Sequence, residues 1–167
     1  MRKNSAVLLL CLVSTLTVQA QKVKPFSKDN IRFEMPNNWG IQNIPPYYIL
    51  VSEPAKPVVQ VLTTFDVEID TLFSDLDSFC TNYEERLGKS EVFLDFFVVS
   101  KKEIDFHGLI AFEYHCTATV TQMPMEWKSV VFVKNDKVYK LSTASLIGQF
   151  RLMEKTTDAI FESFEID

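Results

Sequence analysis

Histidine and glycine are scarce in this chain of 167 residues, and each scarcity excludes a class of functional site. The only histidines are His107 and His115, which excludes a metal centre built from several imidazoles. The four glycines stand alone, at Gly40, Gly88, Gly108 and Gly148. Isolated glycines cannot form the glycine-rich loops that bind phosphate groups or dinucleotides. We therefore expect neither a cofactor nor a metal ion.

The N-terminal apolar run is too short for a membrane-spanning helix, which needs about 20 apolar residues. The apolar run covers residues 6–13 and follows two basic residues, Arg2 and Lys3. A small-residue cleavage site ends at Ala20. This pattern is typical of a secretory signal peptide, with residues 21–167 as the mature chain. Lipoprotein processing at Cys11 is the alternative, and the large Leu10 before it argues against that.

Basic patches are also absent from the mature chain. Without Arg2 and Lys3, 15 basic residues remain against 22 acidic ones, and the formal net charge moves from −5 to −7. Nucleic acid and anionic membranes attract basic patches, so neither is expected as a partner, and the mature chain is not expected to insert stably into a membrane. With 47% hydrophobic and 23% charged residues, the composition is that of one globular domain with a core.

The longest β-type pattern runs through residues 109–145. From 109 to 121, apolar and polar residues alternate with a period of two, which is typical of a half-buried strand. Its apolar positions are Ile110, Phe112, Tyr114, Cys116, Ala118 and Val120. Asn135 and Asp136 then separate two β-type runs, and both residues tolerate the positive φ of a two-residue hairpin turn. We therefore predict an antiparallel meander.

Two segments have the apolar spacing of a helix. The first follows Thr71, which can cap its start, and closes at Gly88. Its apolar stripe is Leu72, Leu76, Phe79, Cys80, Tyr83 and Leu87. The second helix is expected over residues 150–164. Further short strands are expected at residues 31–35, 47–52, 58–65 and 93–101. This order predicts an α+β fold in which an antiparallel β-sheet of about six strands has helices packed on its faces.

Three segments resemble the PsbP-like superfamily, which includes the photosystem II subunit PsbP and the Ran-binding Mog-type proteins. Residues 26–39, FSKDNIRFEMPNNW, are similar to the family's strand that ends in a proline and then a tryptophan. Residues 130–133 with 137–143 resemble the family's hairpin, and residues 160–164 resemble the helix end that closes its fold. The resemblance implies an α/β/α sandwich and an accessory or binding role. It assigns no functional residue.

Few polar side chains are placed for catalysis or metal binding. Glu113 and His115 share one strand face, whereas Cys116 points to the other, so a simple His–Cys metal site is not expected. Cys80 and Cys116 both lie on apolar faces. We expect two buried free thiols there, with a disulfide between them as the alternative.

Acidic and aromatic residues are plentiful. Asp66, Glu68 and Asp70 alternate at a strand exit, and we interpret them as a solvated acidic rim. The 14 phenylalanines indicate a large aromatic core, filled by side chains rather than hollow. Its expected centre is Phe93, Phe96, Phe97, Phe106, Phe112 and Phe132.

Three functional hypotheses follow. The first is an exported, non-enzymatic accessory or binding domain that acts through a protein partner or another component of the cell envelope. The second is a small-molecule or lipid carrier with an aromatic-lined pocket. The third is an enzyme with an unrecognised site, which requires a cleft that gathers Glu113, His115 and a third polar group.

One segment is the candidate contact for a protein partner. Residues 122–127 are expected to connect two strands, and such connections are normally polar and exposed. This one carries Met123, Met125 and Trp127, which are residue types that suit interfaces. Tyr47 and Tyr48 are candidates beside it. The alternative, which we favour for Trp127, is that this residue begins a strand and points into the core.

Overall fold

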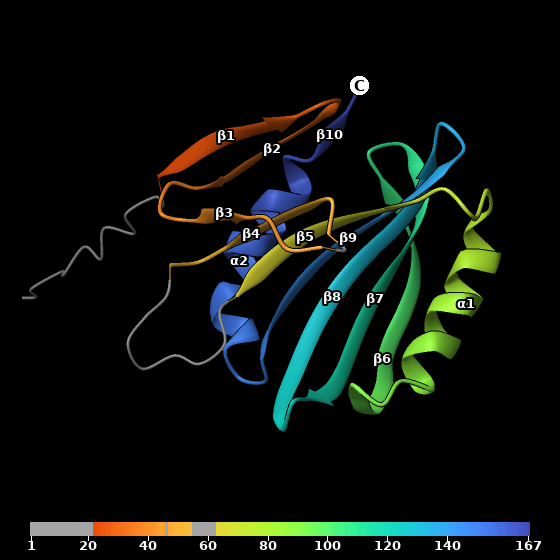
Figure 1. Ribbon diagram of the computed structural model, residues 1–167. Coiled ribbons are helices and arrows are strands. Elements are labelled where there is room, and N and C mark those ends of the chain that lie inside the picture. Colours follow the sequence, from red (N-terminus) through yellow and green to blue (C-terminus); the bar gives the residue numbers. More distant parts are fainter. Residues whose placement is uncertain (1–21, 46, 55–62) are drawn as a thin grey trace, which may run out of the picture.

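The computed structural model describes residues 22–45, 47–54 and 63–167, and these form two antiparallel sheets and two helices (Figure 1). The predicted signal peptide, and residues 58–62 of a predicted strand, lie outside the described residues. The α+β class and the antiparallel sheet are confirmed, although the main sheet has seven strands rather than about six.

The strands divide unequally between the two sheets. The small sheet has the order β1 (Val23–Lys28), β2 (Ile31–Pro36) and β10 (Glu165–Ile166). The large sheet has the order β3 (Gly40–Gln42), β4 (Ile49–Ser52), β5 (Thr64–Asp70), β9 (Lys137–Leu146), β8 (Met123–Lys134), β7 (Leu109–Val120) and β6 (Phe93–Phe106). The four strands β6 to β9 are consecutive in the chain and form an antiparallel meander, of which β7 to β9 were predicted as a meander.

Three two-residue turns join the strands of the meander, and both residues of each turn have positive φ. The turns are His107-Gly108, Thr121-Gln122 and Asn135-Asp136. This geometry matches the twist of the strands that it joins. The turn at Asn135-Asp136 was predicted and is confirmed.

The predicted connection over residues 122–127 is wrong. Pairing between β7 and β8 continues up to Val120 and Met123, so only Thr121-Gln122 remains as the turn. Met123, Met125 and Trp127 therefore belong to β8. Thr and Gln are not the usual turn residues at positive φ, which is why the pattern placed the end of the strand incorrectly.

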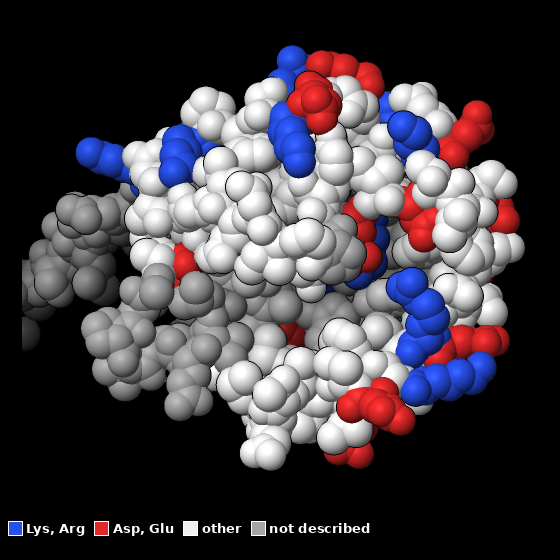
Figure 2. All heavy atoms as spheres, in the orientation of Figure 1, with Lys and Arg blue, Asp and Glu red and all other residues white. Residues whose placement is uncertain are grey.

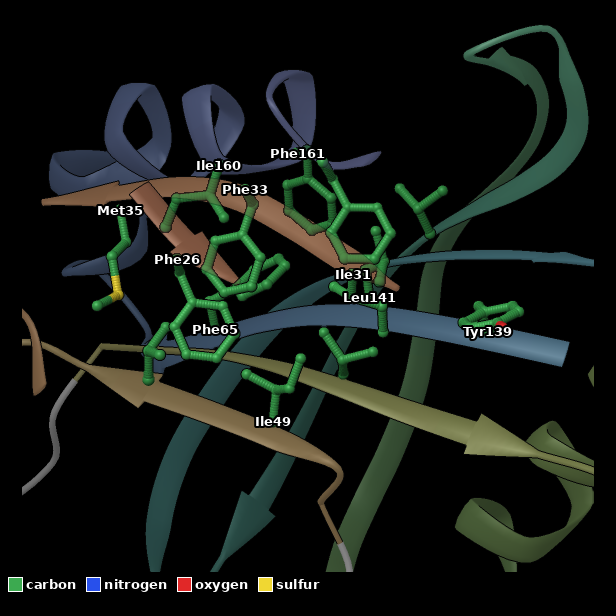
Figure 3. Close-up of a cluster of buried hydrophobic side chains, with 14 of the residues drawn as sticks. Phe26, Ile31, Phe33, Met35, Ile49, Phe65, Tyr139, Leu141, Ile160 and Phe161 are labelled. Carbon is green, nitrogen blue, oxygen red and sulfur yellow. The ribbon is translucent and has the colours of Figure 1, made fainter. Parts of the chain in front are cut away.

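Each face of the large sheet packs against a helix, as predicted (Figure 1). On one face, α2 (Phe150–Glu162) and the small sheet enclose the α2-side core. Ile160 and Phe161 point from α2, and Phe33 from β2, toward the strands of the large sheet (Figure 3). On the other face, α1 (Leu76–Gly88) packs Phe79, Cys80 and Tyr83 against the meander and encloses the α1-side core.

Both helices are shorter than predicted, each at one end. Helix α1 begins at Leu76 because the Asp75 carboxylate accepts a hydrogen bond from the Ser78 N–H at 2.8 Å and caps the first turn. Thr71 is therefore not the cap, and Leu72 is 88% exposed. Helix α2 begins at Phe150 as predicted but ends at Glu162. The described residues contain no helix long and apolar enough to cross a membrane.

The aromatic core is centred on the α2 side and includes two of the six predicted residues, Phe106 and Phe132. The Phe33 ring lies 4.7 Å from that of Phe26 and 5.2 Å from that of Phe65. Of the predicted centre, Phe106 and Phe132 are buried, whereas Phe97 is 64% exposed. The others, Phe93, Phe96 and Phe112, are partly buried on the α1 side.

The exposed position of Phe97 follows from irregular pairing in β6. The register with β7 shifts between Leu94 and Phe97 and again between Val98 and Ser100, which breaks the alternation of faces. The alternation in β7 also fails at its first apolar position, because Ile110 is 69% exposed.

Cys80 and Cys116 are buried free thiols, as predicted. Burial raises the pKa of both thiols, that of Cys116 to about 12. Neither thiol is therefore poised as a thiolate nucleophile at neutral pH.

Candidate functional site

Two adjoining depressions, of about 300 and 390 Å³, lie between the β6–β7 turn and the end of α2 with β10. Phe106 and His107 line both, so the depressions form one open groove, which we call the His107 groove. Together they have the volume of a site for a few side chains or a small ligand.

The floor of the His107 groove is apolar. The apolar lining residues are Ile104, Phe106, Leu109, Val130, Phe132, Phe161, Phe164 and Ile166. Five of these are buried members of the α2-side core, so the groove opens directly onto that core. Such a floor can accept an apolar side chain and remove it from water.

His107 stands between the two depressions and is held from two sides. Its Nε2 lies 3.2 Å from the carbonyl oxygen of Phe161 in α2, and its ring meets the Phe106 ring edge-on with centroids 4.5 Å apart. His107 lies in the β6–β7 turn at positive φ and contacts α2 from there. His107, which separates the two depressions, is thus held in place by a turn and a helix that are distant in the sequence.

Carboxylates predominate around this floor. Six acidic residues face two lysines, which gives the lining a formal charge of −4; they are Asp105, Glu113, Asp158, Glu162, Glu165 and Asp167, with Lys128 and Lys134. Lys128 lies 2.8 Å from Asp158 and 3.4 Å from Glu113. Burial works against its charged form, but these two carboxylates outweigh burial and raise the pKa of Lys128. Arg32, outside the lining, lies 3.5 Å from Glu165 and 2.5 Å from Asp167, so the surplus of negative charge around the apolar floor is three rather than four.

The groove contains Glu113 but not His115. The His115 Nε2 lies 2.6 Å from Glu126, and its ring stacks on that of Phe150 in α2. The cleft that the enzyme hypothesis required is therefore not formed by Glu113 and His115 together. The described residues also contain no group of three or more His, Cys, Asp or Glu side chains that could hold a metal ion.

The candidate contact residues on β8 do not form an exposed loop. Trp127 is only 7% exposed, and its indole N–H donates to the Tyr83 hydroxyl at 3.1 Å. Trp127 therefore points into the core, as the favoured alternative held, but β8 begins at Met123 and not at Trp127. Met123 and Met125 are partly buried along the strand.

The two candidate tyrosines have separate environments. Tyr48 donates a hydrogen bond to Asp29, which raises its pKa to about 12, and the Lys28 ammonium lies 4.0 Å from the centre of its ring. Tyr47 is 37% exposed, and its pKa is raised by burial and then by Asp66 and Glu68. The five candidate residues therefore do not form one exposed surface.

The prediction of a solvated acidic rim is wrong for Asp66 and incomplete for Glu68. Asp66 is only 6% exposed, and Glu68 lies 2.7 Å from the largely buried Lys140 ammonium. Burial opposes the charge on Lys140, but Tyr83, Asp66 and Glu68 outweigh burial and raise its pKa. Pairing of β5 with β9 brings these groups together, and no local pattern at Asp66 indicates that neighbour.

Positive and negative side chains lie interspersed on the face seen in Figure 2, and basic residues do not gather into a patch there. Negative charge gathers instead around the His107 groove. The sequence did not reveal this groove, since its walls come from β6, β7, β8, α2 and β10. The resemblance of residues 160–164 to a closing helix end was the only signal near it.

No protein-family model and no curated protein matches the sequence. Several solved structures are similar in fold. Cyanobacterial PsbP (CyanoP) from Synechocystis has a TM-score of 0.66 and 13% identity, over 93% of this chain and 99% of that chain. The Ran-binding protein Mog1p from Saccharomyces cerevisiae has a TM-score of 0.61 and 9% identity, over 88% of this chain and 96% of that chain.

A third similar structure is LpqN of Mycobacterium tuberculosis, a protein involved in cell envelope biogenesis. Its TM-score is 0.58 with 15% identity, over 87% of this chain and 90% of that chain. At such identities, the likeness concerns the fold and not the activity. The expected PsbP-like architecture is thereby confirmed, and the chain has the fold that is shared by PsbP and Mog1p.

Proposed function

We propose that this chain is an exported, non-enzymatic binding domain, and that the His107 groove holds a segment of a protein partner. The observation that carries the proposal is the groove itself, where buried aromatic side chains form a floor beneath six carboxylates. An apolar anchor beside charged groups at the rim is the common arrangement of a protein interface.

The charge around the groove indicates the chemistry of the partner. Lys128 is already paired with Asp158 and Glu113, whereas Glu162 is an exposed carboxylate at the end of α2. A lysine or arginine of the partner would find a complementary charge there. The segment should therefore combine an aromatic or large aliphatic side chain with basic residues.

The similar structures support a binding role without identifying the partner. Mog1p is a Ran-binding protein, and LpqN is involved in cell envelope biogenesis. Export is part of the proposal because of the signal-peptide pattern that ends at Ala20. Together these features favour a partner in the cell envelope. We favour a protein over a lipid because the groove is open and ringed by carboxylates.

Selection from a random peptide library tests the proposed function. Peptides that bind the mature chain should be enriched in lysine or arginine next to aromatic or aliphatic residues. Glu162→Lys should weaken the binding of a selected peptide by about tenfold, because it reverses one charge at the rim. Glu91→Lys makes the same change at an exposed position just before β6, at the opposite end of that strand from Phe106, and should leave affinity unchanged.

Two results would contradict the proposed function. One is an enriched set of peptides without basic residues. The other is an equal affinity of a selected peptide for the Glu162→Lys and Glu91→Lys variants.

A further inference from the structure

Asp66 has an unusual position on the α1-side face of the large sheet. It is 6% exposed, and among the described residues its Oδ1 is the one buried side-chain oxygen or nitrogen without a hydrogen-bond partner. A buried carboxylate oxygen without a donor is costly, because it has lost water and gained nothing in exchange. A donor from a ligand or from water would satisfy such an atom.

The neighbours of Asp66 are already committed to other partners. In the sheet register Asp66 lies between Leu50 of β4 and Ser142 of β9. The Ser142 hydroxyl forms a hydrogen bond of 2.9 Å with that of Ser129. Lys140, the nearby cation, lies 2.7 Å from Glu68.

Lys140 also stands over the Tyr83 ring of α1, with 5.0 Å between its ammonium and the ring centre. The ionised cluster of Asp66, Glu68 and Lys140 thus carries one uncompensated negative charge.

The cluster extends from the interior toward solvent. The side chains of Lys140 and Glu68 are 11% and 30% exposed, so exposure increases from Asp66 outward. Tyr47 is 37% exposed, and the charges of Asp66 and Glu68 both act on its hydroxyl. A small group that entered beside Tyr47 and Glu68 would meet the Asp66 carboxylate at the inner end.

We propose that Asp66 is the inner end of a binding site for a primary alkylammonium group, with Tyr47 and Glu68 at its entrance. An ammonium supplies the N–H donor that Asp66 Oδ1 lacks and a positive charge that neutralises the excess negative charge of the cluster. Tyrosine rings favour cations at their faces, and burial strengthens the attraction between the charges. This site lies on the α1 side of the sheet, whereas the His107 groove lies on the α2 side, so the two proposals are independent.

A bound proton competes with the ammonium. Burial raises the pKa of Asp66, Lys140 opposes the rise and Glu68 adds to it, and the net result is a pKa of about 7. The carboxylate is therefore mostly neutral at pH values below about 7 and mostly charged above. Affinity for the ammonium should rise about tenfold between about pH 6 and about pH 8, following the ionised fraction of Asp66.

Amide NMR of the mature chain tests the site with three probes. Ethylammonium carries charge and donor, tetramethylammonium carries charge without a donor, and ethanol has a donor without charge. Only ethylammonium should produce saturable shifts at Leu50 and Ser142, the neighbours of Asp66 in the sheet. Equal binding of tetramethylammonium, or no saturable shift with ethylammonium, would overturn the proposal; the latter result would mean that water alone satisfies Asp66.

Matched variants give a second test. Asp66→Asn should lower the affinity for ethylammonium at least tenfold and remove its dependence on pH. Asp136→Asn makes the same change in the exposed β8–β9 turn. It should alter neither the affinity for ethylammonium nor the pH dependence of that affinity. An Asp66→Asn protein with native amide shifts and unchanged affinity overturns the proposal. If that variant does not fold, the comparison of probes and the pH dependence of the wild-type protein still decide the question.

Discussion

The indole N–H of Trp127 in β8 donates to the hydroxyl of Tyr83 in α1, with N and O 3.1 Å apart. This bond joins the meander to the helix that covers it. The rings of Phe93 and Phe96 pack against the same indole, with centroids 5.8 and 6.0 Å from it. Trp127 is therefore a core residue with a specific polar partner, and it is not available to a protein partner.

Replacing Trp127 by Phe should destabilise the fold. The variant keeps much of the apolar contact but removes the donor and leaves the buried Tyr83 hydroxyl without it, at a cost of about 1–3 kcal/mol. Urea unfolding measures this cost. Tyr83→Phe removes the acceptor instead, and the double variant should cost less than the two single costs added together. Strict additivity would mean that the hydrogen bond contributes nothing.

Two phenylalanines that the sequence pattern placed together should differ sharply when replaced. Phe132 is 1% exposed, so Phe132→Ala should cost about 3–5 kcal/mol. Phe97 is 64% exposed, and Phe97→Ala should change the free energy of unfolding by less than about 0.5 kcal/mol. Chemical denaturation of both variants provides the comparison, and similar losses of stability would show that β6 is not irregular as described.

Asp66 should make stability depend on pH in a defined window. Its folded pKa is raised from the ordinary 3.8 to about 7, so between these values the folded chain holds a proton that the unfolded chain has released. Stability is therefore lost as pH rises from about 4 to about 7 and is constant above. The loss is on the order of 4 kcal/mol.

Unfolding of the wild-type protein and of Asp66→Asn, followed across that window, isolates this contribution. The difference between them should change with pH in favour of the variant, and Asp136→Asn controls for the loss of a carboxylate. A constant difference across the window would show that Asp66 is charged throughout.

The export prediction concerns residues outside those that the structure describes. Protein recovered from outside the cytoplasm should have an intact mass that begins at Gln21, with or without cyclisation of that glutamine. A species that retains Met1, or one with a lipid on Cys11, would contradict cleavage after Ala20.

Local patterns predicted the elements, whereas contacts between distant segments decided the sites. The alternation in β7 and the Asn135-Asp136 turn are signals within a few residues, and both were recognised. The Thr121-Gln122 turn was missed because neither residue type normally marks positive φ. A strand end that was misplaced in this way turned Met123 and Trp127 into an apparent loop.

The two sites could not be predicted, since each is assembled by pairing across the fold. Asp66 resembles any acidic residue of a half-buried strand until β9 places Lys140 beside it. His107 has the pattern of a turn residue, and its contact with Phe161 exists only once α2 packs on the sheet. In both cases the sequence identifies the residue but not the distant residue that it contacts in the fold.

Site-specific photo-cross-linking in the cell that makes the protein tests the partner groove most directly. A photoreactive amino acid replaces Glu162 at the rim of the His107 groove, or Glu91 as an exposed control near the far end of β6. We predict a discrete cross-linked protein from position 162 alone, joined through a segment that contains basic and apolar residues. Cross-linking from both positions, or from neither, would contradict the account of a partner-binding groove.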